Sequence, residues 1–135
     1  MNFKKALARL QMVQASDLAS LSDLEKEGLI QRFEYTYELS WKTLQDFLRY
    51  KGYTDFAGPN ATLSLALQDC YITDVDGWRK MKKSRELMSH TYDEGQVDLI
   101  AIDIAGIFAD LLKQLCIRLE KEPALREHID RVRVC

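Results

Sequence analysis

The stretch SDLEKEGLIQRFEYTYELSWKTLQDFLRYKG, residues 22–52, decides the fold. Its apolar side chains recur every three or four residues, as on one face of an α-helix; they are Ile30, Phe33, Tyr37, Trp41, Leu44 and Leu48. Ser22 and Glu25 have the spacing of a capping box, and Gly52 is the residue type that commonly follows a helix end. The stretch therefore predicts one long amphipathic helix.

Helical patterns continue on both sides of this stretch. The spacing of Phe3, Leu7, Leu10 and Val13 predicts a first helix from about Phe3 to Ala19. After a turn-rich connection, Pro59 opens a short helix through Leu63, Leu67 and Cys70. A fourth helix follows the capping residues Thr73, Asp74 and Asp76, and one of its faces carries Trp78, Met81, Arg85 and Met88.

The last long helix is the most apolar one. Asp93 and Gln96 resemble a second capping box, and the helix runs to about Glu120 on Val97, Ile100, Ile104, Phe108, Leu111, Leu115 and Leu119. Further apolar residues widen its apolar surface, namely Leu99, Ile102, Ile107 and Leu112. This surface predicts either a dimer seam, where Ala105, Gly106 and Ala109 let a second helix approach, or a central helix contacted on several sides.

The fold class follows from these patterns. No stretch has the alternation of a β-strand, so we expect an all-α, antiparallel up-and-down bundle of about five helices. One domain is expected over residues 1–135, with residues 123–135 as a last short helix or a loose tail.

Composition excludes several functional classes. With 19 basic and 21 acidic residues, no global basic field marks a nucleic-acid binder, so RNA binding would need a local patch. Cys70, Cys116 and Cys135 form no CxxC pair, and we read Cys116 as a core residue. The absence of a long apolar run and of a signal-peptide pattern predicts a cytoplasmic protein without membrane contact. The common nucleotide, metal and hydrolase motifs are missing, so neither a cofactor nor a metal is expected.

The segment from Arg85 to Tyr92 is the strongest candidate for chemistry. Arg85 lies on the apolar face of its helix, where a guanidinium must be paired or line a cleft. If the helix ends near Ser89, His90 and Tyr92 fall in a corner beside it, and the three side chains share one pocket. Such a set suits phosphodiester cleavage without a metal. The alternative is a structural salt bridge at Arg85 and a loop histidine.

Other charged residues have simpler explanations. Arg79, Lys82 and Lys83 form a compact basic cluster beside the candidate pocket, either a site for RNA or nucleotide or a solvated helix face. Asp93 and Glu94 are explained by helix capping.

Two segments resemble a known family. Residues 31–44, QRFEYTYELSWKTL, are similar to the signature of the nucleotidyltransferase substrate-binding protein family, and Arg85, His90 and Tyr92 fit the R-x4-H-x-Y pattern of the HEPN superfamily that contains it. The resemblance implies a homodimeric helical bundle that binds a minimal nucleotidyltransferase encoded nearby. In related HEPN toxins the motif Arg and His cleave RNA such as tRNA or mRNA, and the nucleotidyltransferase silences the toxin by transferring AMP to the motif tyrosine.

Carried over by position, the resemblance implies that Arg85 stabilises phosphate, His90 acts in acid–base catalysis and Tyr92 accepts AMP. One residue departs from the pattern of many HEPN nucleases, because Glu86 stands where a polar amide often follows the arginine. Two alternatives therefore stay open, a non-catalytic subunit that binds substrate or nucleotide for a nucleotidyltransferase, and a purely structural dimer.

Overall fold

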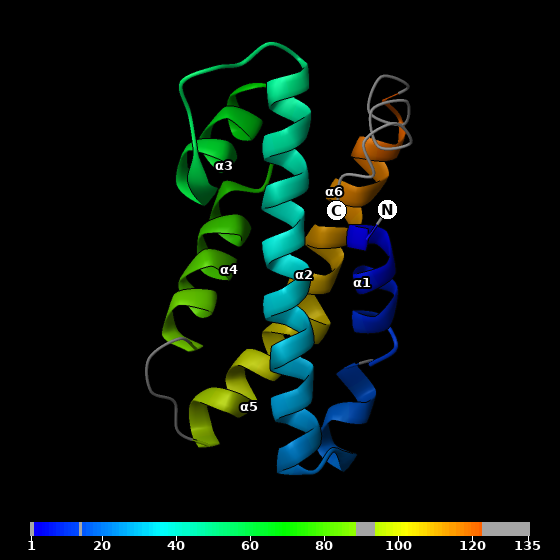
Figure 1. Cartoon of the computed structure of the whole chain (residues 1–135). Coiled ribbons are helices and arrows are strands. Elements are labelled where there is room, and N and C mark those ends of the chain that lie inside the picture. The colour runs from blue at the N-terminus through cyan, green and yellow to red at the C-terminus, as the bar shows by residue number, and fades with distance from the viewer. Residues whose placement is uncertain (1, 14, 89–93, 123–135) are drawn as a thin grey trace.

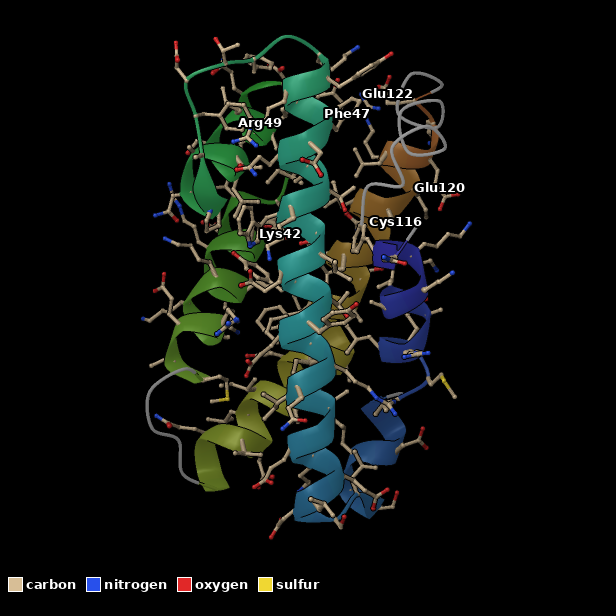
Figure 2. All side chains as sticks on the ribbon, viewed as in Figure 1. Lys42, Phe47, Arg49, Cys116, Glu120 and Glu122 are labelled. Carbon is tan, nitrogen blue, oxygen red and sulfur yellow. The ribbon has the colours of Figure 1, made fainter. Side chains whose placement is uncertain are left out.

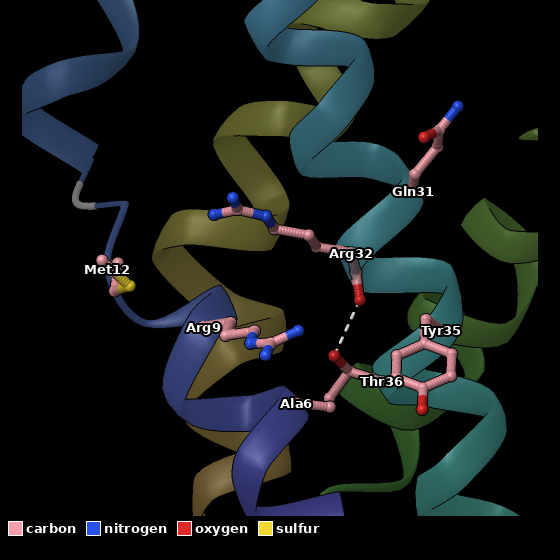
Figure 3. A pocket seen from close by; sticks show the side chains of 7 residues that line it. All are labelled: Ala6, Arg9, Met12, Gln31, Arg32, Tyr35 and Thr36. Carbon is pink, nitrogen blue, oxygen red and sulfur yellow. Dashed lines mark hydrogen bonds between the residues drawn. The ribbon is translucent and has the colours of Figure 1, made fainter.

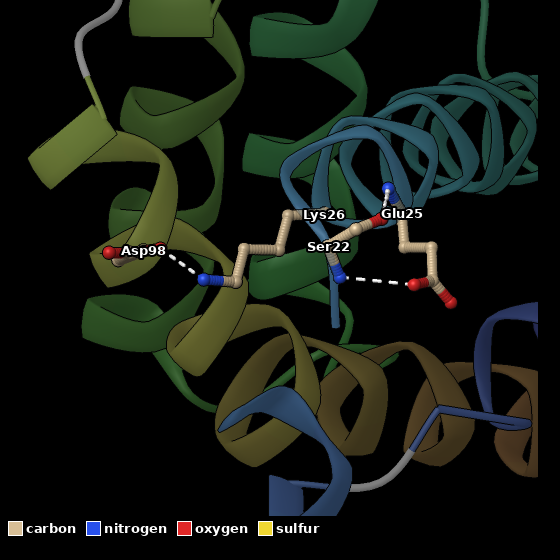
Figure 4. Close-up of polar contacts among 4 residues, drawn as sticks. All are labelled: Ser22, Glu25, Lys26 and Asp98. Carbon is tan, nitrogen blue, oxygen red and sulfur yellow. Dashed lines mark hydrogen bonds and ion pairs between the residues drawn. The ribbon is translucent and has the colours of Figure 1, made fainter. Parts of the chain in front are cut away.

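Helix α2, Asp23–Tyr50, is the longest element and runs along the length of the bundle (Figure 1). The computed structural model describes residues 2–13, 15–88 and 94–122. At the start of α2, the Glu25 amide donates to Ser22 Oγ at 3.1 Å and the Ser22 amide donates to Glu25 Oε1 at 3.0 Å (Figure 4). Gly52 follows the helix end with a φ of 108°, which a side chain would disfavour. The predicted capping box and end signal are confirmed.

Four further helical rods surround α2. Helix α1, Asn2–Leu10, is followed by a 3₁₀ helix, Ala15–Ser20. Helices α3, Gly58–Gln68, and α4, Val75–Met88, follow one another alongside α2 (Figure 1). Helix α5, Glu94–Asp103, continues through a π-helical turn, Ile104–Phe108, into α6, Ala109–Glu120. The described ranges contain no β-strand, so the predicted all-α bundle of about five helices is confirmed.

Two sequence-based expectations were wrong. The first helix ends at Leu10, nine residues before Ala19, because the chain turns at Gln11 to Val13 and re-forms as a 3₁₀ helix that buries Leu18. Ser20 stabilises that turn by donating from Oγ to the Asp17 carbonyl at 2.7 Å. Cys70 lies beyond α3, exposed and with a φ of 62°, so it is not part of the apolar face of that helix.

The core joins the predicted apolar faces of all the helices. Phe33 of α2 stacks on Phe108 of the π-helical turn, with ring centroids 5.3 Å apart. All seven predicted core positions of the last helix are buried. Leu112 is fully buried too, as expected of a helix contacted on several sides, whereas Leu99, Ile102 and Ile107 are 65%, 54% and 38% exposed.

Polar contacts also join helices of the bundle. Lys4 of α1 pairs with Glu120 of α6 at 3.2 Å. The buried Cys116 donates to the same carboxylate at 3.4 Å, and Figure 2 labels both residues. Lys26 of α2 pairs with Asp98 of α5 at 2.8 Å (Figure 4). No helix in the described part of the chain is both long and apolar enough to cross a membrane.

Candidate functional site

Arg85 of α4 faces two carboxylates of α2. Its Nη1 lies 3.8 Å from Glu34 Oε2, and its Nε lies 3.6 Å from Glu38 Oε1. The three side chains are between 27% and 34% exposed, so the cluster lies at the edge of the core and is open to solvent. This position agrees with the expectation that an arginine on the apolar face must be paired.

The guanidinium of Arg85 makes ion pairs but leaves hydrogen-bonding capacity unused. Both distances to the carboxylates exceed hydrogen-bond length, and Nε is buried without a hydrogen-bond partner in the described part of the chain. The hydroxyl of Tyr37, which lies between Glu34 and Glu38 on α2, is likewise buried and has no partner among the same residues. Because a guanidinium has five N–H donors, Arg85 can still bind an acceptor such as a phosphate oxygen.

Burial keeps the Tyr37 phenol protonated. It raises the pKa of Tyr37 to about 12, and the negative charges of Glu38 and Glu86 add to the rise while Arg85 opposes it. Tyr37 is therefore a neutral hydroxyl at physiological pH and acts beside Arg85 only as a hydrogen-bonding group.

Trp41 holds one of the two carboxylates in place. Its indole Nε1 donates to Glu38 Oε2 at 3.1 Å, which leaves Oε1 facing Arg85. Glu34, Tyr37, Glu38 and Trp41 follow one another at close helical spacing, so one side of α2 carries all four. They belong to the stretch 31–44 that the sequence analysis singled out.

The other residues predicted for this site fall outside the described residues. His90 and Tyr92 belong to the segment 89–93, so their meeting with Arg85 stays a prediction, as does the capping role of Asp93 in the same segment. Glu86 is paired with Lys82 at 3.5 Å, one turn away on α4.

The predicted basic cluster lies on another side of α4. Arg79 and Lys82 line a cavity of about 200 Å³ between α3 and α4, which also includes Trp78 and Ser64. Lys83 is exposed nearby. These residues can form a second positively charged surface, but they do not extend the Arg85 cluster, which faces α2.

The sequence alone did not indicate Glu34, Tyr37 and Glu38 as parts of the site. Tyr37 was predicted as a core residue, and neither glutamate was given a role. The sequence does contain an indication of a polar cluster, because two glutamates one turn apart lie on the same side of the helix as Tyr37 and Trp41. Their partner could not be found in this way, since helical spacing does not tell which neighbouring helix faces that side.

Comparisons with known proteins agree with this architecture. The sequence profile described as "Nucleotidyltransferase substrate binding protein like" matches residues 1–121. A crystal structure of a protein from Thermus thermophilus is 35% identical in sequence, with a TM-score of 0.72 over 88% of this chain and 99% of that one. Among curated proteins, none matches. The profile covers every described helix, and the chain belongs to the nucleotidyltransferase substrate-binding protein family, which is HEPN-like.

Proposed function

We propose that this protein is the HEPN component of a two-gene system, an RNA-cleaving toxin bound and silenced by a minimal nucleotidyltransferase. The observation that carries the proposal is Arg85, which lies at the arginine position of the R-x4-H-x-Y pattern, at the edge of the core and 27% exposed, with an Nε that has no hydrogen-bond partner among the described residues. An arginine needed only for packing would be expected to use its donors on the carboxylates beside it.

The chemistry assigned to this site requires no metal. His90 removes the proton from a ribose 2′-hydroxyl, whose oxygen forms a bond to the adjacent phosphorus while the bond from phosphorus to the 5′ oxygen breaks. The leaving 5′ oxygen takes up a proton from solvent, and His90 passes the proton that it removed to solvent. Arg85 stabilises the additional negative charge on the phosphoryl oxygens in the transition state. Glu34 and Glu38 position the guanidinium.

Silencing is assigned to Tyr92. Its phenolic oxygen attacks the α-phosphorus of ATP in the nucleotidyltransferase, pyrophosphate leaves, and the phenolic proton passes to solvent or to a base. The product carries a negatively charged nucleotide two residues from His90. Such a group blocks the site and repels the RNA backbone.

A second copy of this chain is the proposed occupant of the exposed apolar face of α5 and the π-helical turn. Leu99 and Ile102 are more than half exposed there, and an added Cβ at Gly106 would meet nothing within 4 Å. A copy of the same face offers self-complementary apolar side chains across a two-fold axis.

A non-catalytic, substrate-binding subunit is the second candidate function, and the charge of the site favours it. One guanidinium faces two carboxylates, so the described cluster has an excess of one negative charge, and Glu86 directly follows Arg85 in the chain. This field opposes an RNA phosphate and favours a cationic or neutral substrate group. In that case Arg85 orders the glutamates that bind the substrate of the nucleotidyltransferase.

Growth after induced expression separates the two functions. The wild-type protein is expressed beside Arg85→Ala, His90→Ala and the control Arg49→Ala, which removes an arginine in the last turn of α2. For a nuclease, wild type and Arg49→Ala stop growth, Arg85→Ala and His90→Ala permit it, and co-expression of the nucleotidyltransferase restores growth to wild type. Unaffected growth with well-expressed, folded wild-type protein would overturn the nuclease proposal in favour of the substrate-binding subunit.

A further inference from the structure

A cavity of about 420 Å³ lies between α1 and α2, on another side of α2 from the Arg85 cluster (Figure 3). Its volume is in the range of small-molecule sites. Each residue of an α-helix is turned by about 100° from the one before it. The α2 residues that line the cavity therefore point roughly 140° away, around the helix axis, from the α2 residues beside Arg85. The cavity is lined by Ala6, Arg9, Met12, Gln31, Arg32, Tyr35 and Thr36.

Two arginines from different helices line this cavity. Figure 3 shows Arg9 reaching from α1 toward α2 and Arg32 reaching from α2 toward α1. Within residues 2–13, 15–88 and 94–122, neither guanidinium has an ion pair or a hydrogen bond. Helix α1 itself has three basic residues and no acidic one. Two arginines that line one cavity, with no carboxylate among its lining residues, offer a site for an anion.

The uncharged walls of the cavity indicate what else the anion carries. Tyr35 is 58% exposed and Met12 is 74% exposed, so an aromatic ring and a thioether are available at the surface. The exposed Gln31 adds an amide that can donate and accept hydrogen bonds. The Thr36 hydroxyl is not available as a donor, because it donates to the Arg32 carbonyl at 2.7 Å.

We propose that this cavity binds a nucleoside phosphate, with the phosphate on Arg9 and Arg32 and the base against Tyr35. An arginine pair recognises phosphate oxygens, and a tyrosine ring stacks on any base. The nucleotide is either free or one unit of a single-stranded RNA. Because none of the lining residues belongs to the Arg85 cluster, the site stands independently of the function proposed above.

Calorimetric titration of the purified, full-length protein with AMP, with adenosine and with a short oligouridylate tests this site. We expect AMP to bind and adenosine to bind at least tenfold more weakly, since adenosine lacks the phosphate. Arg9→Gln and Arg32→Gln should each weaken AMP binding about tenfold, the scale of a lost charge-assisted hydrogen bond. Tyr35→Leu should weaken it about tenfold, while Tyr35→Phe keeps the ring and should bind as wild type.

A matched control separates a built site from general charge. Lys5→Gln removes one positive charge from the same helix but outside the cavity. It should bind AMP as wild type does, with melting curves showing that every variant is folded.

The outcomes decide both the site and the source of the ligand. AMP binding lost in the two arginine variants assigns the cavity to a free nucleotide, and binding of oligouridylate alone with the same losses assigns it to an RNA strand. Failure of folded wild-type protein to bind either probe overturns the proposal. So does equal binding of adenosine and AMP, or an equal loss in Lys5→Gln and Arg9→Gln.

Discussion

Tyr37 is 2% exposed, and its hydroxyl has no hydrogen-bond partner among residues 2–13, 15–88 and 94–122. A buried polar group without a partner destabilises the folded state, so removing it should not destabilise the protein. We expect Tyr37→Phe to unfold at pH 7 with a free energy equal to that of wild type or about 1 kcal/mol higher. Urea unfolding measures this, with Tyr35→Phe, which removes an exposed hydroxyl, as the control. A loss above about 1 kcal/mol would show that Tyr37 has a stabilising partner.

The same residue makes stability depend on alkaline pH. The pKa of Tyr37 is raised from 10.0 to about 12 in the folded state, so the unfolded chain releases this proton first. This group therefore leaves the free energy of unfolding independent of pH below about pH 10, and lowers it as the pH rises through 12, by about 3 kcal/mol in total. Unfolding of wild type and Tyr37→Phe between these pH values should show a steeper decline for wild type. Equal slopes would contradict the buried position of the hydroxyl.

At the residue scale, the sequence located Arg85 but not its environment. The three- and four-residue spacing from Trp78 and Met81 placed the guanidinium on an apolar face, which predicted pairing or a cleft. Its partners could not be predicted, because they depend on how α4 is placed against α2. Glu34 and Glu38 lie about 50 positions away in the sequence, and no local rule links them to Arg85.

At the element scale, local chemistry predicted helix ends wherever a side chain or a glycine determines them. Ser22 with Glu25, Gly52 and Asp74 all act as expected, the last by accepting from the Gly77 amide at 2.9 Å. The end of α1 was predicted wrongly because its apolar spacing continues past Leu10. The burial of Leu18 by a 3₁₀ turn depends on packing against the rest of the bundle, which spacing cannot anticipate.

Gly77 and Gly28 should respond in opposite ways to alanine. An added Cβ at Gly77 would lie 2.7 Å from Asp74 Oδ2 and 2.8 Å from Leu111 Cδ1, so it would disturb both the helix cap and the packing of α4 against α6. We expect Gly77→Ala to lower the free energy of unfolding by about 1 kcal/mol, after the gain in helix propensity is included. Gly28, within α2, has nothing within 4 Å of an added Cβ.

Gly28→Ala is therefore the matched control, and it should raise the free energy of unfolding by about 0.5 to 1 kcal/mol. Chemical unfolding of the two variants beside wild type measures both changes. Two stabilising substitutions would mean that α4 has room to move away from α6.

At the scale of the whole molecule, the apolar surface of the last helix had two possible explanations, a dimer seam or a central helix contacted on several sides. In the structure, some of its residues fit one explanation and some the other. Leu112 is buried as in a central helix, while Leu99 and Ile102 remain exposed. Sequence periodicity could not make this division, because every one of these positions is equally apolar. Which side faces the core depends on the angle at which α5 and α6 cross α2 and α1, and on the π-helical turn that shifts the helical phase at Ile104.

The exposed part of that surface should hold two copies together in the proposed homodimer. Leu99→Glu with Ile102→Glu places two charges in the seam, facing the same charges of the second copy, so we expect the dimer to dissociate into folded monomers. Leu24→Glu is the matched control, since Leu24 is 78% exposed and lies on a different helix, α2. Sedimentation velocity over a range of protein concentrations measures the mass. A wild type that is monomeric throughout, or a dimer that persists in the double variant, would show that the exposed face is not the seam. RNA cleavage would then have to be completed within one chain, by Arg85 and His90 of the same bundle.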